Sequence, residues 1–382
     1  MSSDKPTHAR LSPLRRIYVI DGATQVLTPE MMLLDCAGKE IPAPTGEKTE
    51  PVVDETVDLA PGTFPDDGTP PEHYLPAVLR QLDAPRQYPV HFPESYACSR
   101  IAGALLETLF RTGHFRLDDL AADLEWTWDS APMGNMAAFY AAVRAACEYI
   151  DCLGIRLRKW SYTEAEHSAL QVRTGLTAAE PGEDDEFAEE EAPGKLRFGR
   201  KRRCPDVLGA NASDWIVYIP FDPCQPRLGG SVLAESVGAP SATAPDIGDG
   251  DYFIDCYEVV RELVEDGIIR CGVPVGPGGL MTALSALTRE GTGADVDIAL
   301  LRKSWDGVLP VRALYGEVPG VLVTIADIDF DYLDAELLLQ DVVWFPLGHP
   351  TPGKPGIRIA PEGAPGIASI LESLLNASEG ED

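Results

Sequence analysis

The sequence predicts an α+β fold, and two observations lead to that class. Strand-like and helical segments interleave along the 382 residues, but without the regular alternation that builds a doubly wound parallel sheet. The composition, 45% hydrophobic and 24% charged, is typical of a globular protein with a sizeable core. A chain of this length favours two packed units over one small domain.

Charge and cysteine usage narrow the classes of partner. Sixty-one acidic and 31 basic residues give a net charge of −30, which repels phosphate backbones and anionic membranes, so we expect no nucleic-acid and no membrane partner. The eight cysteines form no CxxC pair and no zinc-type spacing, which predicts reduced thiols and no metal site. The N-terminus lacks the apolar core of a signal peptide, and no apolar run is long enough to span a membrane. We expect a cytoplasmic protein.

The first 90 residues predict few regular elements. Residues 16–20 have strand-like composition and end at Asp21-Gly22, a dipeptide that favours a tight turn. Residues 36–75 are rich in Pro, Gly, Asp and Glu and are predicted to be mostly loop. Within them, residues 51–59 alternate enough for one exposed strand.

Two helices and a short strand follow. Apolar residues recur at helical spacing across 95–112, which predicts the first helix. Asn135 is placed to cap a second helix over 136–150, and Gly154 lies just past its end. A short strand over 155–157 should come next.

Residues 178–205 form an acidic block followed by a basic one, which predicts a flexible, self-attracting insertion. Its basic run, 200–203, has two interpretations. It contacts an anion, or it neutralises its acidic neighbours.

The remaining sequence predicts a second unit of mixed strands and helices. Its expected strands are 215–220, 268–271, 295–300, 321–325 and 342–347. Its expected helices are 252–266, 280–288, 331–340 and 366–375, followed by an acidic tail over 377–382.

Three strings in this second unit are candidates for a ligand site. Gly229, Gly230 and Ser231 follow a strand and precede a helix, and Gly278 and Gly279 open another helix. Adjacent glycines in such places let the backbone approach closely and aim N–H groups at an anion, but they also serve plain turns. The third string, LYGEVPGVLV, places Glu317 just before a strand, where a carboxylate is commonly solvated or hydrogen-bonded.

In order and spacing, RLGGSVLAE, GPGGLMTAL and LYGEVPGVLV resemble the C-terminal half of the synthetase region of phosphoribosylformylglycinamidine synthase. That family belongs to the aminoimidazole ribonucleotide synthase superfamily, and its corresponding strings have the flavour LGGSALAQ, HDRSDGGL and F-x-E-E-x-G-x-V. Residues 126–154 look like the family segment that runs from a SANW-like string through a helix to a short strand. The resemblance covers about residues 95–375 and includes neither a glutaminase signature nor the other synthetase half.

The resemblance implies a domain organisation. Residues 1–90 are poorly matched, 91–222 correspond to the synthase N-terminal domain with the insertion at 178–205, and 223–376 correspond to the synthase C-terminal domain. The expected architecture is an α/β barrel-half followed by an α+β sandwich.

Several positions depart from the family pattern. Where the family has a lysine loop, this chain has RKWSYT, so Ser161 replaces the phosphate-binding lysine and Lys159 substitutes only if the loop shifts. The string 273–279 lacks the family's metal-binding aspartate and its nucleotide-contacting serine. In the family's helix, two magnesium ligands fall on Ala104 and Thr108, with Glu107 displaced by one residue, about 100° around the helix.

The resemblance thus implies ancestry more firmly than activity. The first interpretation is a degenerate homologue or split subunit that supports formylglycinamidine ribonucleotide synthesis by assembly, as a homodimer or with a complementary synthetase half. The second is an active ATP-dependent ligase that uses shifted residues, namely Lys159, Glu107, Asp129 and the glycine backbones, with ATP or ADP and magnesium as ligands. The third is a diverged scaffold or regulatory protein unconnected with purines.

Overall fold

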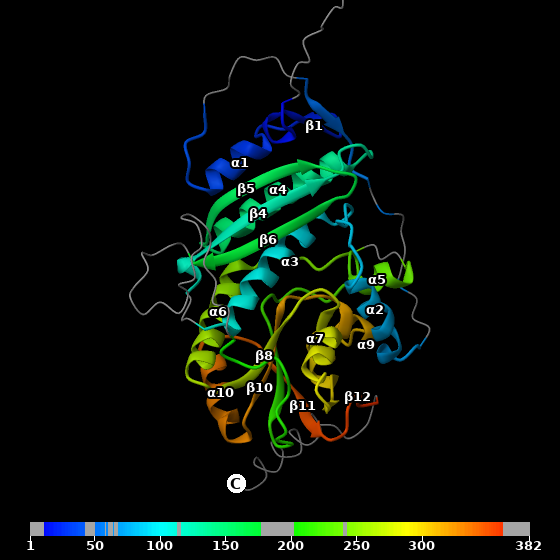
Figure 1. The fold of residues 1–382 in the computed structure, drawn as a ribbon, viewed down its shortest axis with the longest axis vertical. Helices are drawn as coiled ribbons and strands as arrows, with labels where there is room; N and C mark the ends of the chain where they lie inside the picture. The colour runs from blue at the N-terminus through cyan, green and yellow to red at the C-terminus, as the bar shows by residue number, and fades with distance from the viewer. Residues whose placement is uncertain are drawn as a thin grey trace, which may run out of the picture.

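The computed structural model describes residues 11–42, 50–57, 59, 64, 68–112, 116–176, 202–239 and 243–361. The helix expected at 366–375, the acidic tail and most of the 178–205 insertion lie outside these residues. The described chain forms two three-stranded sheets and one six-stranded sheet with helices between and around them, which confirms the α+β class (Figure 1). The domain boundaries remain predictions.

The N-terminal sheet has the strand order β2-β1-β3. Its strands are β1 (Tyr18–Ile20), β2 (Ala23–Thr24) and β3 (Val52–Asp54). Asp21 and Gly22, at φ 52° and 76°, make the predicted turn between β1 and β2. Helix α1 (Pro29–Cys36), which the sequence analysis missed, is capped by Thr28 and packs on α4 (Asn135–Cys152).

The middle sheet has the order β5-β4-β6 and packs against α4 and α3 (Pro93–Leu106) (Figure 1). Its strands are β4 (Leu120–Trp128), β5 (Arg156–Glu164) and β6 (Ala169–Leu176). The prediction of a strand at 155–157 ended it too early. β5 pairs in parallel with β4 as far as Glu164.

The cap of α4 differs from the prediction. Asn135 lies in the first turn of the helix, after Gly134, whose φ is 88°. The carboxylate of Asp54 accepts hydrogen bonds from the amides of Gly134, Met136 and Ala137, at 2.8, 2.8 and 3.0 Å. The Asp54 side chain from β3 thus accepts the free backbone amides at the start of α4, a role that the sequence predicted for Asn135.

The large sheet has the strand order β12-β9-β11-β7-β10-β8. Its strands are β7 (Trp215–Pro220), β8 (Ile269–Val275), β9 (Thr292–Val296), β10 (Gly320–Ile325), β11 (Phe345–Pro352) and β12 (Ile357–Ile359). All neighbouring strands are antiparallel except β12 and β9. β7, predicted from its apolar run, lies in the interior of this sheet between β11 and β10.

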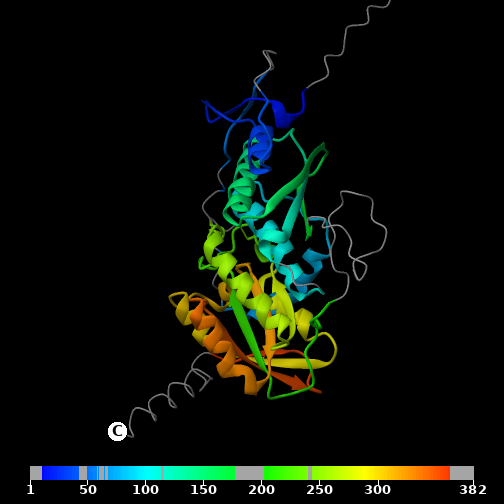
Figure 2. The same cartoon turned by 90° about the vertical axis from the view of Figure 1, so that its left-hand side faces the viewer.

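Helices cover both faces of the large sheet. α6 (Gly250–Glu265) and α10 (Phe330–Leu339) lie on one face, in front of the sheet in Figure 2. On the other face, or beside it, are α2 (Leu75–Leu82), α5 (Val232–Val237), α7 (Gly279–Leu287), α8 (Ala299–Ser304) and α9 (Pro310–Tyr315). Across the described residues, no helix combines the length and the apolarity that a membrane crossing requires.

Two predicted strands of this unit are displaced. The strand expected at 295–300 ends at Val296, because the Asp297 carboxylate accepts the amide of Ala299 at 2.8 Å and the chain turns into α8. The strand expected at 342–347 begins only at Phe345 and extends to Pro352.

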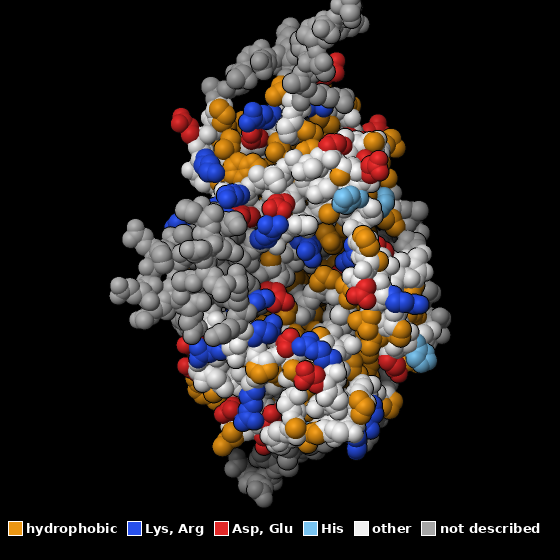
Figure 3. Space-filling model, in the orientation of Figure 1, with side chains coloured by type: hydrophobic (Ala, Val, Ile, Leu, Met, Phe, Trp, Pro, Cys, Tyr) orange, Lys and Arg blue, Asp and Glu red, His pale blue; other side chains and the backbone are white. Residues whose placement is uncertain are grey.

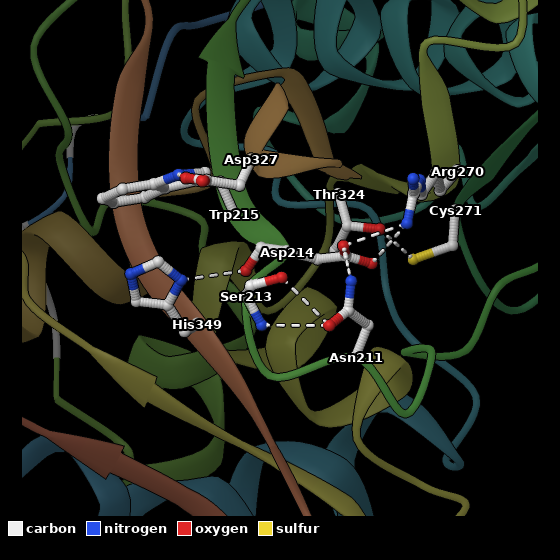
Figure 4. Close-up of polar contacts among 9 residues, drawn as sticks. All are labelled: Asn211, Ser213, Asp214, Trp215, Arg270, Cys271, Thr324, Asp327 and His349. Atoms are coloured by element: carbon white, nitrogen blue, oxygen red, sulfur yellow. Dashed lines mark hydrogen bonds and ion pairs between the residues drawn. The ribbon is translucent and has the colours of Figure 1, made fainter. Parts of the chain in front are cut away.

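A polar network closes the end of the large sheet where β7 starts (Figure 4). The buried carboxylate of Asp214 accepts hydrogen bonds from Asn211 Nδ2 at 2.6 Å and from Arg270 Nη1 at 3.0 Å. His349 Nδ1 lies 3.0 Å from the backbone oxygen of Asp214, and its ring lies 4.1 Å from that of Trp215. These groups satisfy one another, so the network anchors three strands and leaves its buried carboxylate paired.

Candidate functional site

The first glycine turn joins β7 to α5 and depends on close backbone packing. The Gly229 amide donates to Thr243 O at 2.7 Å, and a Cβ on Gly229 would come within 2.4 Å of that same carbonyl. Gly230 has φ 72°, a conformation that favours glycine. Ser231 caps α5, because its Oγ accepts the amide of Ala234 at 3.2 Å.

The second glycine turn opens α7. Gly278 and Gly279 have φ values of 81° and 66°, so both need the left-handed region. A Cβ on Gly279 would lie 2.5 Å from the carbonyl oxygen of Leu314 in α9. The turn therefore lets α7 and α9 approach closely.

Glu317 joins the two turns, in the group that we call the glycine-turn cradle: Gly229–Ser231, Gly278–Gly279 and Glu317. Its Oε1 accepts the amide of Val232 at 2.6 Å and the amide of Gly278 at 2.9 Å. Glu317 itself has φ 53°, and its carboxylate stands where the two turns aim their N–H groups. An internal carboxylate thus takes the place that an anionic ligand would occupy.

Arg86, which the sequence analysis missed, crosses the cradle. Its Nε donates to Glu235 Oε2 at 3.0 Å and its Nη2 donates to the backbone oxygen of Gly230 at 3.3 Å. Burial raises the pKa of Glu317, although the Arg86 charge and the two amides act in the opposite direction. Burial acts to lower the pKa of Arg86, but the charges of Glu317 and Glu235 leave that pKa raised.

Little space remains at Glu317 itself, although a cavity of about 350 Å³ is lined in part by Gly230 and Ser231. The cavity that touches Glu317 has a volume of about 20 Å³. Its lining also includes Phe92, Tyr96, Gly230 and Ser231. That volume is close to what a single water needs, which is far less than a nucleotide phosphate chain.

Lys159 and Ser161 lie elsewhere, which corrects the expectation that they belong to a loop. Both are exposed residues of strand β5, where they pair with Asp123 and Glu125 of β4. On the face shown in Figure 3, basic side chains are interspersed with acidic ones. No contact among the described residues joins Lys159 or Ser161 to the cradle.

Asp129, the carboxylate proposed as a shifted ligand, is also remote from Lys159. Lys159 pairs with Asp123, and Asp129 lies six residues further along the same direction, about 20 Å at the usual rise of a strand. Its Oδ1 already accepts the amide of Ala131 at 3.0 Å.

The helix positions expected to match magnesium ligands are packed or paired. Thr108 is buried, and its hydroxyl hydrogen-bonds Leu105 O at 2.6 Å and Tyr257 Oη at 2.5 Å. Glu107 lies 3.6 Å from the Arg202 guanidinium. A Cβ on Gly272 would lie 2.3 Å from the Phe110 ring, so this ring fills the space between β8 and the 3₁₀ helix Glu107–Phe110 that follows α3.

The described part of the basic run is also engaged internally. Arg202 donates to Gly272 O at 2.6 Å, and Arg203 pairs with Glu265 at 3.0 Å. Within the described ranges, no three His, Cys, Asp or Glu side chains gather as a metal site would require. These residues do not fit a magnesium nucleotide at the cradle or beside Thr108.

Comparison with known proteins identifies relatives for most of the chain. No family model matches it. It is 25% identical over 267 residues to a probable phosphoribosylformylglycinamidine synthase, chloroplastic/mitochondrial, of Arabidopsis thaliana, and 25% identical over 264 residues to the Homo sapiens enzyme. The chain is a relative of phosphoribosylformylglycinamidine synthase.

The match to these phosphoribosylformylglycinamidine synthases is partial. The alignments cover 67% and 65% of this chain, but only 17% and 18% of the two relatives, so the chain spans less than a fifth of their length. Two Thermotoga maritima structures share the fold, each at 14% identity and each over 71% of this chain. They are PurLQS, with a TM-score of 0.50 over 40% of its chain, and PurL complexed with FGAR, with a TM-score of 0.52 over 41%.

Proposed function

We propose that this chain supports formylglycinamidine ribonucleotide synthesis by assembly with a catalytic synthetase half, and that it does not itself turn over nucleotide. The observation that carries the proposal is the Glu317 carboxylate, which holds both the Val232 and the Gly278 amides. An anionic phosphate and this carboxylate would compete for the same donors and would repel each other.

The replacement of nucleotide ligands supports the same proposal. Thr108 is hydrogen-bonded in the core, and Lys159 and Ser161 are exposed on a strand away from the cradle. An active ligase that uses Lys159, Glu107 and Asp129 would need these residues to converge, and no contact among the described residues brings them together.

The partner surface is proposed from the middle sheet. β5 and β6 are both edge strands of the described sheet, and an edge strand presents unpaired backbone groups to another chain. The partner is a second copy of this chain or a complementary synthetase half, acting in the cytoplasm.

Calorimetric titration of the purified chain with Mg-ATP tests the loss of nucleotide binding. We expect no binding tighter than about 10 μM, an affinity that corresponds to roughly 7 kcal/mol. A tighter dissociation constant that weakens in Lys159→Ala would favour the active-ligase interpretation. The matched control is Lys354→Ala, which removes an exposed lysine between β11 and β12.

Native mass measurement of the protein from its own host tests assembly. A homodimer or a complex with a purine-pathway synthetase supports the proposal. A monomer without ribonucleotide, or a complex with no purine-pathway component, would point to the scaffold interpretation.

A further inference from the structure

Helix α10 is apolar on two opposite sides. Leu333 and Leu337 are fully buried in the core beneath the helix. At 100° per residue, Leu338 and Leu339 point away from that core, and they are 69% and 75% exposed. A helix that is apolar all round is normally covered on both sides, so the outer side of α10 lacks a partner among the described residues.

The exposed side of α10 is part of a larger apolar surface. We call it the α10 patch, and its members are Ile328, Tyr332, Leu338, Leu339 and Val343. In Figure 2, α10 lies at the front of the molecule with no described element over it. Such a gathering of exposed apolar side chains marks a surface that another segment or chain covers.

The described chain leaves the large sheet at the end where α10 begins. The row of paired residues across the sheet at this end is Ile359, Val296, Gly348, Ile216 and Thr324. Phe330, the first residue of α10, packs on Trp215 beside this row, with the ring centroids 5.0 Å apart. The residues that follow β12 therefore start from the same level of the sheet as α10.

The chain after residue 361 is long enough to reach α10. This helix connects β10 to β11, the two neighbours of β7, and β12 lies three strand spacings from β7, about 14 Å. Residues 362–365 span up to about 14 Å when extended. The helix that the sequence predicts over 366–375 would be about 15 Å long, the same as the ten residues of α10.

The sequence of this segment suits an apolar surface. In GIASILESLL, residues 366–375, the apolar positions at helical spacing are Ile367, Ile370, Leu371, Leu374 and Leu375, and Glu372 falls outside their stripe. Neither residues 362–382 nor α10 contain Lys, Arg or His, so no ion pair can form between them. A contact between the two would be apolar.

We propose that residues 366–375 of this chain form an amphipathic helix that packs its apolar stripe on the α10 patch. A stable dimer buries about 800 Å² on each partner, more than these five side chains expose, whereas a segment of the same chain acts at a high effective concentration. The proposal does not depend on the function proposed above, because α10 belongs neither to the cradle nor to the middle sheet (Figure 1).

Hydrogen–deuterium exchange of the full chain, read out by peptide mass, tests the proposal. The amides of 366–375 should exchange at least about tenfold more slowly than in an isolated peptide of residues 362–382, because a docked helix opens only rarely. Leu339→Asp puts a charge in the patch and should bring the exchange to within about twofold of the peptide rate. Leu339 is 75% exposed, so this substitution leaves the core of the protein intact.

The reciprocal variant and a control complete the experiment. Leu371→Asp, in the segment itself, should remove the slow exchange as Leu339→Asp does. Val26→Asp changes an apolar residue that is 92% exposed but lies near the N-terminal sheet, and it should leave the exchange of 366–375 slow. Sodium chloride at about 0.5 M should not release the segment, because screening weakens ionic contacts and not apolar ones.

Three results would overturn the proposal. The first is exchange of 366–375 at the peptide rate in the wild type. The second is slow exchange that Leu339→Asp leaves unchanged, or that Val26→Asp removes equally. The third is a dimer in sedimentation equilibrium that Leu339→Asp converts to a monomer, with 366–375 exchanging freely in both, which would assign the α10 patch to a second copy of the chain.

Discussion

The glycine-turn cradle and the cavity of about 670 Å³ between α3, α4 and the loop that precedes α6 are both lined by Phe92. Polar groups are treated in opposite ways in these two regions. In the cradle, the amides of Val232 and Gly278 converge on Glu317. Beside the cavity, the buried hydroxyl of Tyr149 has no partner in the described structure. The difference teaches that glycine strings alone do not locate a ligand site, because the chain can fill such a cradle with its own carboxylate.

The largest expected effect comes from the cradle's backbone. Gly279→Ala should lower the free energy of unfolding by about 3 kcal/mol, since φ 66° disfavours a side chain and the new Cβ would lie 2.5 Å from Leu314 O. Urea denaturation measures the change. Gly22→Ala is the control, because its φ is 76° but nothing lies within 4 Å, so only about 1 kcal/mol should be lost. Equal losses in the two variants would mean that the cradle is not tightly packed.

The second effect concerns Glu317. Glu317→Ala leaves the amides of Val232 and Gly278 without their acceptor, and should cost about 2 kcal/mol. Glu317→Gln keeps a carbonyl oxygen where Oε1 accepts both amides, and should cost less than about 1 kcal/mol. Thermal unfolding of both variants compares them, and equal losses would show that the charge, rather than the acceptor, matters.

The regular elements were largely predictable from sequence, and the contacts of the site were not. β7 and β10 were found because apolar runs between turn residues mark buried strands. β5 was predicted too short because the residues after Leu157 are mostly polar or exposed. Such a pattern is typical of an edge strand and lacks the apolar run that marks a buried one.

The contacts that fill the cradle escaped prediction for another reason. Arg86 meets Glu235 across 149 residues of sequence, and Asp54 meets Met136 across 82, so no local pattern records either pair. Glu317 was singled out, but its partners emerge only when two glycine turns are brought together in space.

The third prediction concerns the start of α4, where the carboxylate of Asp54 accepts backbone amides. Asp54→Ala removes the acceptor of three amides at α4 and should cost about 1–2 kcal/mol, within the range for lost caps. Asn135→Ala should cost less, because Asn135 is not the cap. Chemical denaturation of both variants measures this, and a larger loss in Asn135→Ala would contradict the capping role of Asp54.

A change in stability of the opposite sign is expected at Tyr149 in α4. Tyr149→Phe removes a buried hydroxyl without a described partner and should leave the ligand-free protein unchanged or raise its stability by up to about 1 kcal/mol. Tyr257→Phe is the matched control, because its hydroxyl is bonded to Thr108 and its loss should be destabilising. Destabilisation by Tyr149→Phe would mean that the hydroxyl already has a partner in the free protein.

The smallest expected effect is a pH dependence of the cradle. Burial raises the pKa of Glu317 in the folded chain above its unfolded value, so the folded state binds the proton more tightly. The stability of the wild type relative to Glu317→Gln should therefore fall as pH rises from about 4.5 through the folded pKa, and then stay level.

Asp206 provides a comparison of opposite sign, because its hydrogen bond with Arg289 lowers its pKa. The stability of the wild type relative to Asp206→Asn should rise with pH above the folded pKa of Asp206 and level off near the unfolded value. Urea midpoints between about pH 2 and 7 measure both differences, since the Asp206 change falls below its unfolded pKa of about 3.9. A Glu317 difference that rises with pH would mean that the Arg86 charge outweighs burial.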